Sequence, residues 1–288
     1  MILVDNLSYS YPLAKTPALH EVSLTVSPGE FVAVIGANGS GKSTLCYALT
    51  GFVPHFFHGK LTGRVSVAGQ NTQITPLAEL VTVTGLVFQN PANQISGAKF
   101  TVYDEVAFGL ENLGVPRAEM PGRIAAALSL TGLTDLADRS PNELSGGQQQ
   151  RLALASVLVM APRVLVLDEP TSQLDPLGSR DVFAVIRNLS RRGITVVMAE
   201  HKLEWIAAFA DRVIMLAEGQ ILLDGPPAAV LTSSLLETHH VGRPRFTRLA
   251  AQAQSLGLWP ANRPLPVTLA EAVAGFQSIL TGRENHAD

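Results

Sequence analysis

The sequence of 288 residues predicts an α/β fold. The first observation is an apolar run, Phe31–Ile35, which lies between Pro28-Gly29 and a glycine and so predicts a short buried strand. The second is the glycine-rich stretch Gly36–Thr44, which fits the pattern GxxxxGKS and leads into a helical pattern ending near Gly51. Glycines let backbone N–H groups turn toward phosphate oxygens, and the helix N-terminus adds partial positive charge. A nucleotide site is therefore expected at this loop.

Within the loop, two side chains have defined tasks. Lys42 is expected to reach the β- and γ-phosphates, and the Ser43 hydroxyl is expected to ligate Mg²⁺. The other loop residues expected to contact the nucleotide are Asn38, Gly39, Ser40, Gly41 and Thr44.

Composition favours a soluble, cytoplasmic chain with surface buried against partners. The formal net charge is -3, which argues against a surface that coats nucleic acid. Charged residues are 16% of the chain and the mean hydropathy is +0.23, rather apolar for a soluble protein. The longest apolar candidate for a membrane span is interrupted by Pro162-Arg163, and Met1–Asp5 lacks the basic residues of a signal peptide. The single Cys46 excludes an internal disulfide.

Before the loop, alternating residues predict two strands, Leu3–Tyr9 and Glu21–Val26. Tyr9 and Tyr11 lie about two dozen residues before the loop. Either could stack on an adenine ring, or both could pack on the sheet edge, and spacing alone leaves the two readings open. After the loop, further strands are predicted at Arg64–Val67, Thr82–Phe88, Arg212–Leu216 and Gly219–Asp224.

Polar residues follow three of the predicted strands. Gln89 comes directly after Thr82–Phe88, at the strand end where open α/β sheets bind ligands. Asp168 and Glu169 end the apolar strand Val164–Leu167, and alternation would point them to different sides. Asp168 can then serve the Mg²⁺ shell through water, and Glu169 can orient or deprotonate an attacking water.

A second anion site is predicted downstream of a helical region that spans Phe100–Gly132. Ser145 is suited to an N-cap, and Gly146 and Gly147 follow just inside the helix. A last candidate is His201, which follows the buried strand Thr195–Ala199 and could donate a hydrogen bond to developing charge on a γ-phosphate.

Toward the C-terminus the composition shifts, and two helices are expected. Thr268 and Glu271 form a capping-box pattern at the start of the second helix. Leu269, Val273, Phe276 and Leu280 fall on one face of it, which needs a partner surface on the same domain or on another chain.

Taken in order, these motifs resemble the nucleotide-binding subunits of ABC transporters from about residue 1 to 230. Gly36–Thr44 is similar to their Walker A, Val164–Glu169 to their Walker B, and Leu144–Gln148 matches the LSGGQ signature without a change. The resemblance also matches Gln89 to the Q-loop, Asp175 to the D-loop, His201 to the switch histidine and Tyr11 to the adenine-stacking aromatic.

The resemblance implies a P-loop NTPase (RecA-like) core in residues 1–230, with an N-terminal antiparallel β subdomain and an inserted helical subdomain at about 92–157. It also implies a small C-terminal helical extension, 231–288, which could serve dimerisation. In this family ATP held on one subunit's P-loop meets the Ser145, Gly146, Gly147 and Gln148 segment of a second subunit. Ser43, Gln89 and Asp168 would serve Mg²⁺, with Lys42, Gln89, Glu169 and His201 as catalytic residues.

Within the family, the chain looks most like the ATPases of energy-coupling-factor (ECF) importers of vitamins and metal ions. The segments behind this are Phe88–Gln94, Thr101–Asn112, Pro54–Phe56 and Glu200–Glu204, although Tyr103 replaces an acidic residue of many relatives. Implied partners are a second ATPase subunit, of the same chain or a paralogue, a transmembrane coupling protein and a substrate-binding membrane subunit. The expected location is the cytoplasmic face of the membrane.

Two other functions remain as alternatives. One is the ATPase of a conventional ABC importer or exporter. The other is a soluble ABC ATPase that works on DNA or ribosomes; about a hundred residues without sustained heptads separate the P-loop from the signature, which argues against the DNA-repair type.

Overall fold

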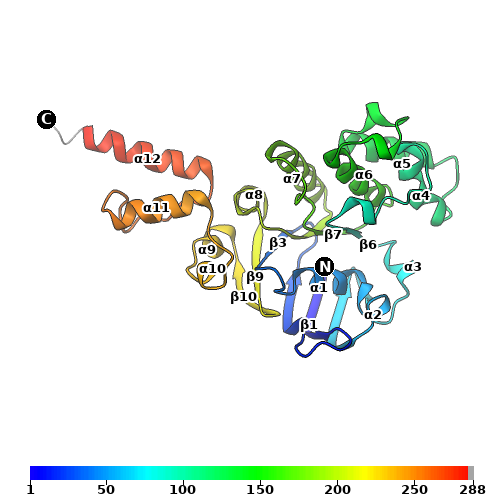
Figure 1. The fold of residues 1–288 in the computed structure, drawn as a ribbon, viewed down its shortest axis with the longest axis horizontal. Helices are drawn as coiled ribbons and strands as arrows, with labels where there is room; N and C mark the ends of the chain where they lie inside the picture. The colour runs from blue at the N-terminus through cyan, green and yellow to red at the C-terminus, as the bar shows by residue number, and fades with distance from the viewer. Residues whose placement is uncertain (285–288) are drawn as a thin grey trace.

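The computed structural model describes residues 1–284, so the last four residues of the predicted extension lie outside the described part. Figure 1 shows an antiparallel sheet beside a larger central sheet, a group of helices at one end, and a pair of C-terminal helices that project from the other end. The predicted α/β fold, with its antiparallel β subdomain, helical subdomain and C-terminal helical extension, is confirmed.

The central sheet has the strand order β10-β9-β3-β8-β7-β6. Its strands run parallel except for β10, which pairs antiparallel with β9 at the edge. The bounds are β3 (Phe31–Ile35), β6 (Thr84–Val87), β7 (Val164–Asp168), β8 (Thr195–Ala199), β9 (Arg212–Ala217) and β10 (Gln220–Gly225). The continuous apolar runs of β3, β7 and β8 fit their burial on both faces.

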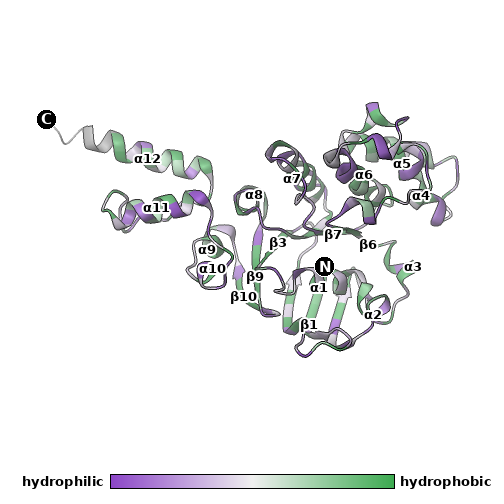
Figure 2. Cartoon of the chain, in the orientation of Figure 1, coloured by the Kyte–Doolittle hydropathy of each residue, from purple (hydrophilic) through white to green (hydrophobic). Residues whose placement is uncertain are grey.

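The N-terminal sheet is antiparallel, with the order β2-β1-β4-β5. Figure 2 shows hydrophobic and hydrophilic segments interleaved along its strands, as expected for a sheet with one buried face. The bounds are β1 (Ile2–Ser10), β2 (Leu19–Val26), β4 (Lys60–Val67) and β5 (Gln70–Asn71).

Helix α1 (Lys42–Thr50) belongs to the core shared by the two sheets. Its Leu45 and Leu49 are fully buried and join side chains from β1, β2 and β4 and from one face of the central sheet. The opposite face of the central sheet, which includes Phe31 and Leu165, forms a second core with α7 (Pro176–Arg191) and α8 (Leu203–Phe209). Alternation along each central strand therefore divides the side chains between two cores.

The helical part packs around a third core, to which α4, α5 and α6 contribute. The bounds are α2 (Phe52–His55), α3 (Leu77–Leu80), α4 (Val102–Asn112), α5 (Met120–Thr131) and α6 (Gly146–Leu158), with 3₁₀ turns at Pro91–Asn93, Thr134–Leu136 and Pro141–Glu143. Within residues 1–284, no helix combines the length and the apolar character needed to cross a membrane.

After the central sheet come α9 (Pro227–Leu231), α10 (Leu235–Thr238), α11 (Arg245–Ser255) and α12 (Leu269–Glu284). The predicted capping box is confirmed, because the Glu271 carboxylate accepts from the Thr268 N–H and the Thr268 hydroxyl accepts from the Glu271 N–H. A small core forms where the Trp259 ring meets Phe276 edge-on. Of the four predicted face residues of α12, only Phe276 packs on this chain, whereas Leu269, Val273 and Leu280 are exposed. The buried side of α12 instead follows Ala272, Phe276 and Ile279.

Candidate functional site

The P-loop, which is the glycine-rich stretch Gly36–Thr44, joins β3 to α1 and forms the floor of a cleft of about 490 Å³. Gly41 has φ +104°, and a Cβ at this position would lie 2.6 Å from the Ala18 carbonyl oxygen, so only glycine fits. The Ser40 hydroxyl is buried and has no hydrogen-bond partner, which is an orphaned polar group suited to an anion in the cradle. Both observations fit a bound phosphate chain.

Lys42 is 5% exposed, and its ammonium donates to the carbonyl oxygens of Gly36 at 3.0 Å and Ala37 at 3.1 Å. Burial lowers the pKa of Lys42, although the carboxylates of Glu169 and Asp168 oppose the change. The loop thus holds a desolvated cation at its own centre, where it would attract phosphate oxygens.

Asp168, at the end of β7, shares the face of the strand that packs toward α1. Its carboxylate is buried and accepts a hydrogen bond from the Ser43 hydroxyl at 3.0 Å. Burial raises the pKa of Asp168, and the bond from Ser43 partly offsets this effect. A hydroxyl and a carboxylate this close are the oxygen donors that Mg²⁺ prefers, so the pair fits the predicted metal position.

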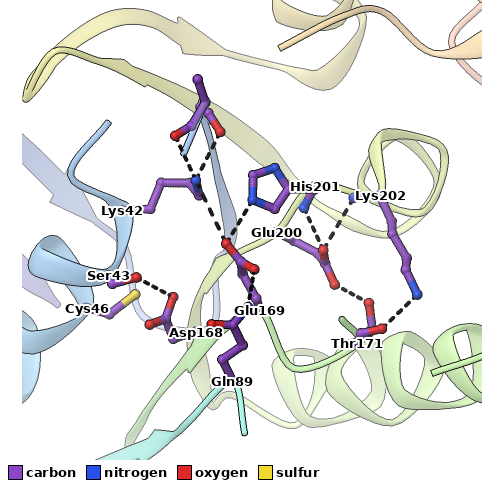
Figure 3. A network of polar contacts seen from close by, with 12 residues as sticks. Lys42, Ser43, Cys46, Gln89, Asp168, Glu169, Thr171, Glu200, His201 and Lys202 are labelled. Carbon is purple, nitrogen blue, oxygen red and sulfur yellow. Dashed lines mark hydrogen bonds and ion pairs between the residues drawn. The ribbon is translucent and has the colours of Figure 1, made fainter. Parts of the chain in front are cut away.

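Glu169 is the centre of the cluster in Figure 3. Its carboxylate accepts from His201 Nε2 at 2.8 Å and from Gln89 Nε2 at 2.7 Å, and Lys42 Nζ lies 3.9 Å away. Three parallel strands deliver these groups: Gln89 follows β6, Glu169 follows β7 and His201 follows β8. Their carboxyl ends meet at one edge of the sheet, as the positions in the sequence predicted.

The position of Tyr11 is compatible with both predictions, that it stacks on an adenine ring and that it packs on the sheet edge. Its hydroxyl hydrogen-bonds with the Thr44 hydroxyl at 3.2 Å, and its ring lines the cleft beside Asn38 and Gly39. The same ring packs edge-on against Tyr9, with 4.9 Å between centroids. A packed ring at the cleft wall remains suited to stack on a base.

The signature residues do not join this cluster. Ser145 caps α6, and a capping box with Gln148 confirms the predicted helix start. Ser145 and Gly147 line a separate cleft of about 310 Å³, together with Asp175, which caps α7 through the Gly178 N–H. The cleft around Lys42 and the cleft around Ser145 have no lining residue in common.

Three residues that were given no site role from the sequence surround the cluster. Glu200 and Thr171 are buried and hydrogen-bonded to each other, and Lys202 contacts the loop that follows Glu169. The only signal in the sequence is the pair of opposite charges that flanks His201 at a strand end.

The fold and the cleft define a P-loop protein, with a cleft suited to a phosphate chain at the carboxyl edge of its central sheet. The sequence model described as "ABC transporter" matches residues 19–172, more than half of the chain. The chain therefore belongs to the ABC transporter family, as an ATP-binding subunit.

Particular relatives agree with this assignment. The chain is 45% identical over 236 residues to the energy-coupling factor transporter ATP-binding protein EcfA1 of Lacticaseibacillus paracasei, covering 82% of each protein. Among solved structures it is similar to cbiO1 from Clostridium perfringens, part of the ABC transporter complex cbiONQ, with TM-score 0.74, 32% identity, and 88% and 98% of the two chains covered. It is also similar to the ATP-binding cassette MJ0796 in a dimer bound to ADP and Pi, with TM-score 0.69, 28% identity, and 79% and 99% covered.

Proposed function

We propose that this chain is the ATP-hydrolysing subunit of an ECF-type importer, which powers uptake of a small solute such as a vitamin or a metal ion. The observation that carries the hydrolytic part of the proposal is the cluster of Lys42, Gln89 and His201 around the Glu169 carboxylate. Similarity to EcfA1 and to cbiO1 supports the ECF type. The ATPase of a conventional ABC importer or exporter is the second candidate, and a soluble ABC ATPase the third.

In this proposal the residues of the P-loop bind and orient ATP. Lys42 neutralises phosphate charge, the loop residues Asn38–Thr44 surround the phosphates, and Tyr11 stacks on the adenine. Ser43, Asp168 and Gln89 would hold Mg²⁺, which offsets the charge of the β- and γ-phosphates when bound.

Glu169 would orient the attacking water and accept its proton. Gln89 and His201 each donate to a different oxygen of this carboxylate, at 2.7 and 2.8 Å, so the base is held from two sides. Held by its contact with Glu169, the His201 ring would lie beside the γ-phosphate, where charge develops during hydrolysis.

A second subunit would complete the site. Ser145, Gly146, Gly147 and Gln148 lie in a different cleft from Lys42, so they can reach a nucleotide only in a neighbouring copy or paralogue. The extension beyond residue 230 would add to this pairing through the exposed Leu269, Val273 and Leu280 of α12. Removing residues from 240 onward should weaken dimerisation, and an unchanged dimer would contradict that role.

The membrane partner would dock beside Gln89. An apolar groove of about 330 Å³ between α1 and the helices α4 and α6 is lined by Phe52, Phe88, Phe108, Leu113 and Met160 among others. Movement of the Gln89 loop on ATP binding and hydrolysis would shift side chains that line this groove. The subunit would thus work as a peripheral protein on the cytoplasmic face of the membrane, with a coupling protein and a substrate-binding membrane subunit.

The test is affinity purification from native membranes, with mass spectrometry of every co-purifying chain. A coupling protein with a small substrate-binding membrane protein would support the ECF assignment, and the second ATPase chain, if different, would appear in the same sample. A conventional permease pair, or no membrane protein, would refute it. Phosphate release from ATP by the purified chain, together with its second ATPase subunit where that is a different chain, and its loss in Lys42→Ala, tests the hydrolysis itself.

A further inference from the structure

The residues directly after β8 contact the loop that follows Glu169. Glu200 is 2% exposed, and its carboxylate accepts from the Thr171 hydroxyl and from the N–H groups of His201 and Lys202. His201 itself contacts Glu169. Figure 3 shows Lys202 on the far side of Glu200 from Lys42, with its ammonium directed at Thr171 and not into the P-loop cleft.

All three donors of the Lys202 ammonium have a partner. They reach the carbonyl oxygen of Thr171 at 2.7 Å, the carbonyl oxygen of Leu174 at 3.1 Å and the hydroxyl of Ser179 at 2.6 Å. An ammonium has three N–H groups and no acceptor, so this set saturates it. Hydrogen bonds from a charged donor are the strong ones.

The contact with Ser179 extends to Asp175. The Ser179 hydroxyl, which is fully buried, donates to the Asp175 carbonyl oxygen at 2.8 Å. Lys202 therefore binds the loop from Thr171 to Asp175 directly at Thr171 and at Leu174. Through Ser179 it is also linked to Asp175. Glu200 holds the Thr171 side chain at the same point.

The loop needs such a support because of Glu169, which lies two residues before Thr171. Glu169 has φ +47°, in the left-handed region that non-glycine residues occupy at a cost. Such a conformation persists only when its surroundings fix the backbone. The Glu169 carbonyl oxygen accepts from the Ser172 N–H at 3.1 Å, so a displaced loop would turn the Glu169 backbone with it.

We infer that Lys202 is a positioning residue for ATP hydrolysis: by fixing the loop from Thr171 to Asp175 it keeps the Glu169 carboxylate aimed between Gln89 and His201. This inference rests on the proposed ATPase function. Because Lys202 does not line the P-loop cleft, it acts on the chemical step and not on nucleotide binding.

The test uses the full chain and four variants. Lys202→Met removes all three donors at nearly constant length, Lys202→Arg restores a cation, and Ser179→Ala removes one acceptor. Arg187→Met is the matched control. Arg187 lies on α7, the helix that carries Ser179, and the substitution removes its 2.6 Å ion pair with Asp211, which is away from the loop. Steady-state phosphate release gives kcat and KM, and hydrogen exchange read by peptide mass spectrometry follows residues 169–175.

We expect kcat of Lys202→Met to fall by about tenfold or more with KM for ATP within about twofold, since a small misplacement of a catalytic group is costly. Lys202→Arg should recover part of kcat, and Ser179→Ala should lose less than Lys202→Met. Exchange in residues 169–175 should be faster in Lys202→Met than in wild type and unchanged in Arg187→Met.

A kcat for Lys202→Met no lower than that of Arg187→Met, or wild-type exchange in residues 169–175, overturns the inference. Failure to release phosphate by the wild-type chain, both alone and together with the second ATPase subunit that co-purifies with it, refutes the proposed function. The exchange comparison still decides whether Lys202 fixes the loop in that case.

Discussion

Replacing Glu169 by glutamine separates the role of this residue as a base from its contribution to the stability of the fold. Glutamine keeps the shape of the side chain but cannot take up a proton from water. General-base catalysis is worth typically 10²–10⁴-fold, or about 2.7–5.5 kcal/mol of barrier at 1.36 kcal/mol per tenfold. We therefore expect Glu169→Gln to lower kcat by roughly 10²–10⁴-fold, with ATP affinity changed by no more than about twofold.

The same substitution should cost little stability. The carboxylate accepts from His201 and Gln89, and its side chain is 15% exposed. The oxygen of the new glutamine can accept from one of them, and its NH₂ group can donate to the other. This requires either the other tautomer of His201 or a rotated Gln89 amide. The loss is then the charge assistance of the bonds, about 1.5 kcal/mol or less, which lowers Tm by roughly 5 °C at most.

The assay is phosphate release at saturating Mg²⁺ and ATP, with binding of a fluorescent ATP analogue and thermal unfolding measured on the same samples. Glu119→Gln is the matched control, because it makes the same chemical change in an exposed pair with Arg123 on the helical part. Retention of more than about a tenth of wild-type kcat by Glu169→Gln would refute the reasoning, since a general base contributes more than that.

Other parts of the molecule give further expectations. Burial raises the pKa of the Cys46 thiol well above its usual range, so a thiol reagent should modify native protein about 10²-fold more slowly than unfolded chain; equal rates would contradict this. A Cβ on Gly85 would lie 2.2 Å from Val157 Cγ1, so Gly85→Ala should cost about 1–3 kcal/mol of unfolding free energy, measured in urea. Burial alone would raise the pKa of Glu204, but hydrogen bonds, chiefly from the Arg245 N–H and guanidinium, hold it below its ordinary 4.5. The contact between Glu204 and Arg245 thus stabilises the fold above pH 4.5, and this stabilisation is lost as pH falls through the lower folded-state pKa of Glu204. The amount by which Arg245→Ala lowers Tm at pH 7 should therefore shrink below pH 4.5.

Local patterns in the sequence were sufficient for the central strands and for most of the side chains that meet at the P-loop cleft. Phe31–Ile35 is wholly apolar, and Thr195–Ala199 is apolar after its first residue, so their burial on both faces follows from composition. Because parallel strands place their carboxyl ends together, residues that directly follow those strands, such as Glu169 and His201, could be expected to meet.

The remaining features depend on contacts that no local pattern encodes. The acceptors of Lys202 are mainly backbone carbonyls, which have no signature in the residue types around them. The buried side of α12 is set by Trp259, which lies in the preceding loop and covers Phe276. Likewise, no local pattern predicts the left-handed backbone of Glu169 or the pairing of its N–H with the Ala199 carbonyl on the neighbouring strand.

The position of α1 links nucleotide binding to the folding of the whole body. Leu45 and Leu49 are fully buried in the core that both sheets share, so unfolding of the helix that follows the P-loop would expose this core. A ligand that binds only the folded loop adds about 2.7 kcal/mol when its free concentration is a hundredfold above Kd. For this chain the gain would apply to the core that the two sheets share, so the nucleotide concentration would become one of the factors that set the folded fraction of the protein.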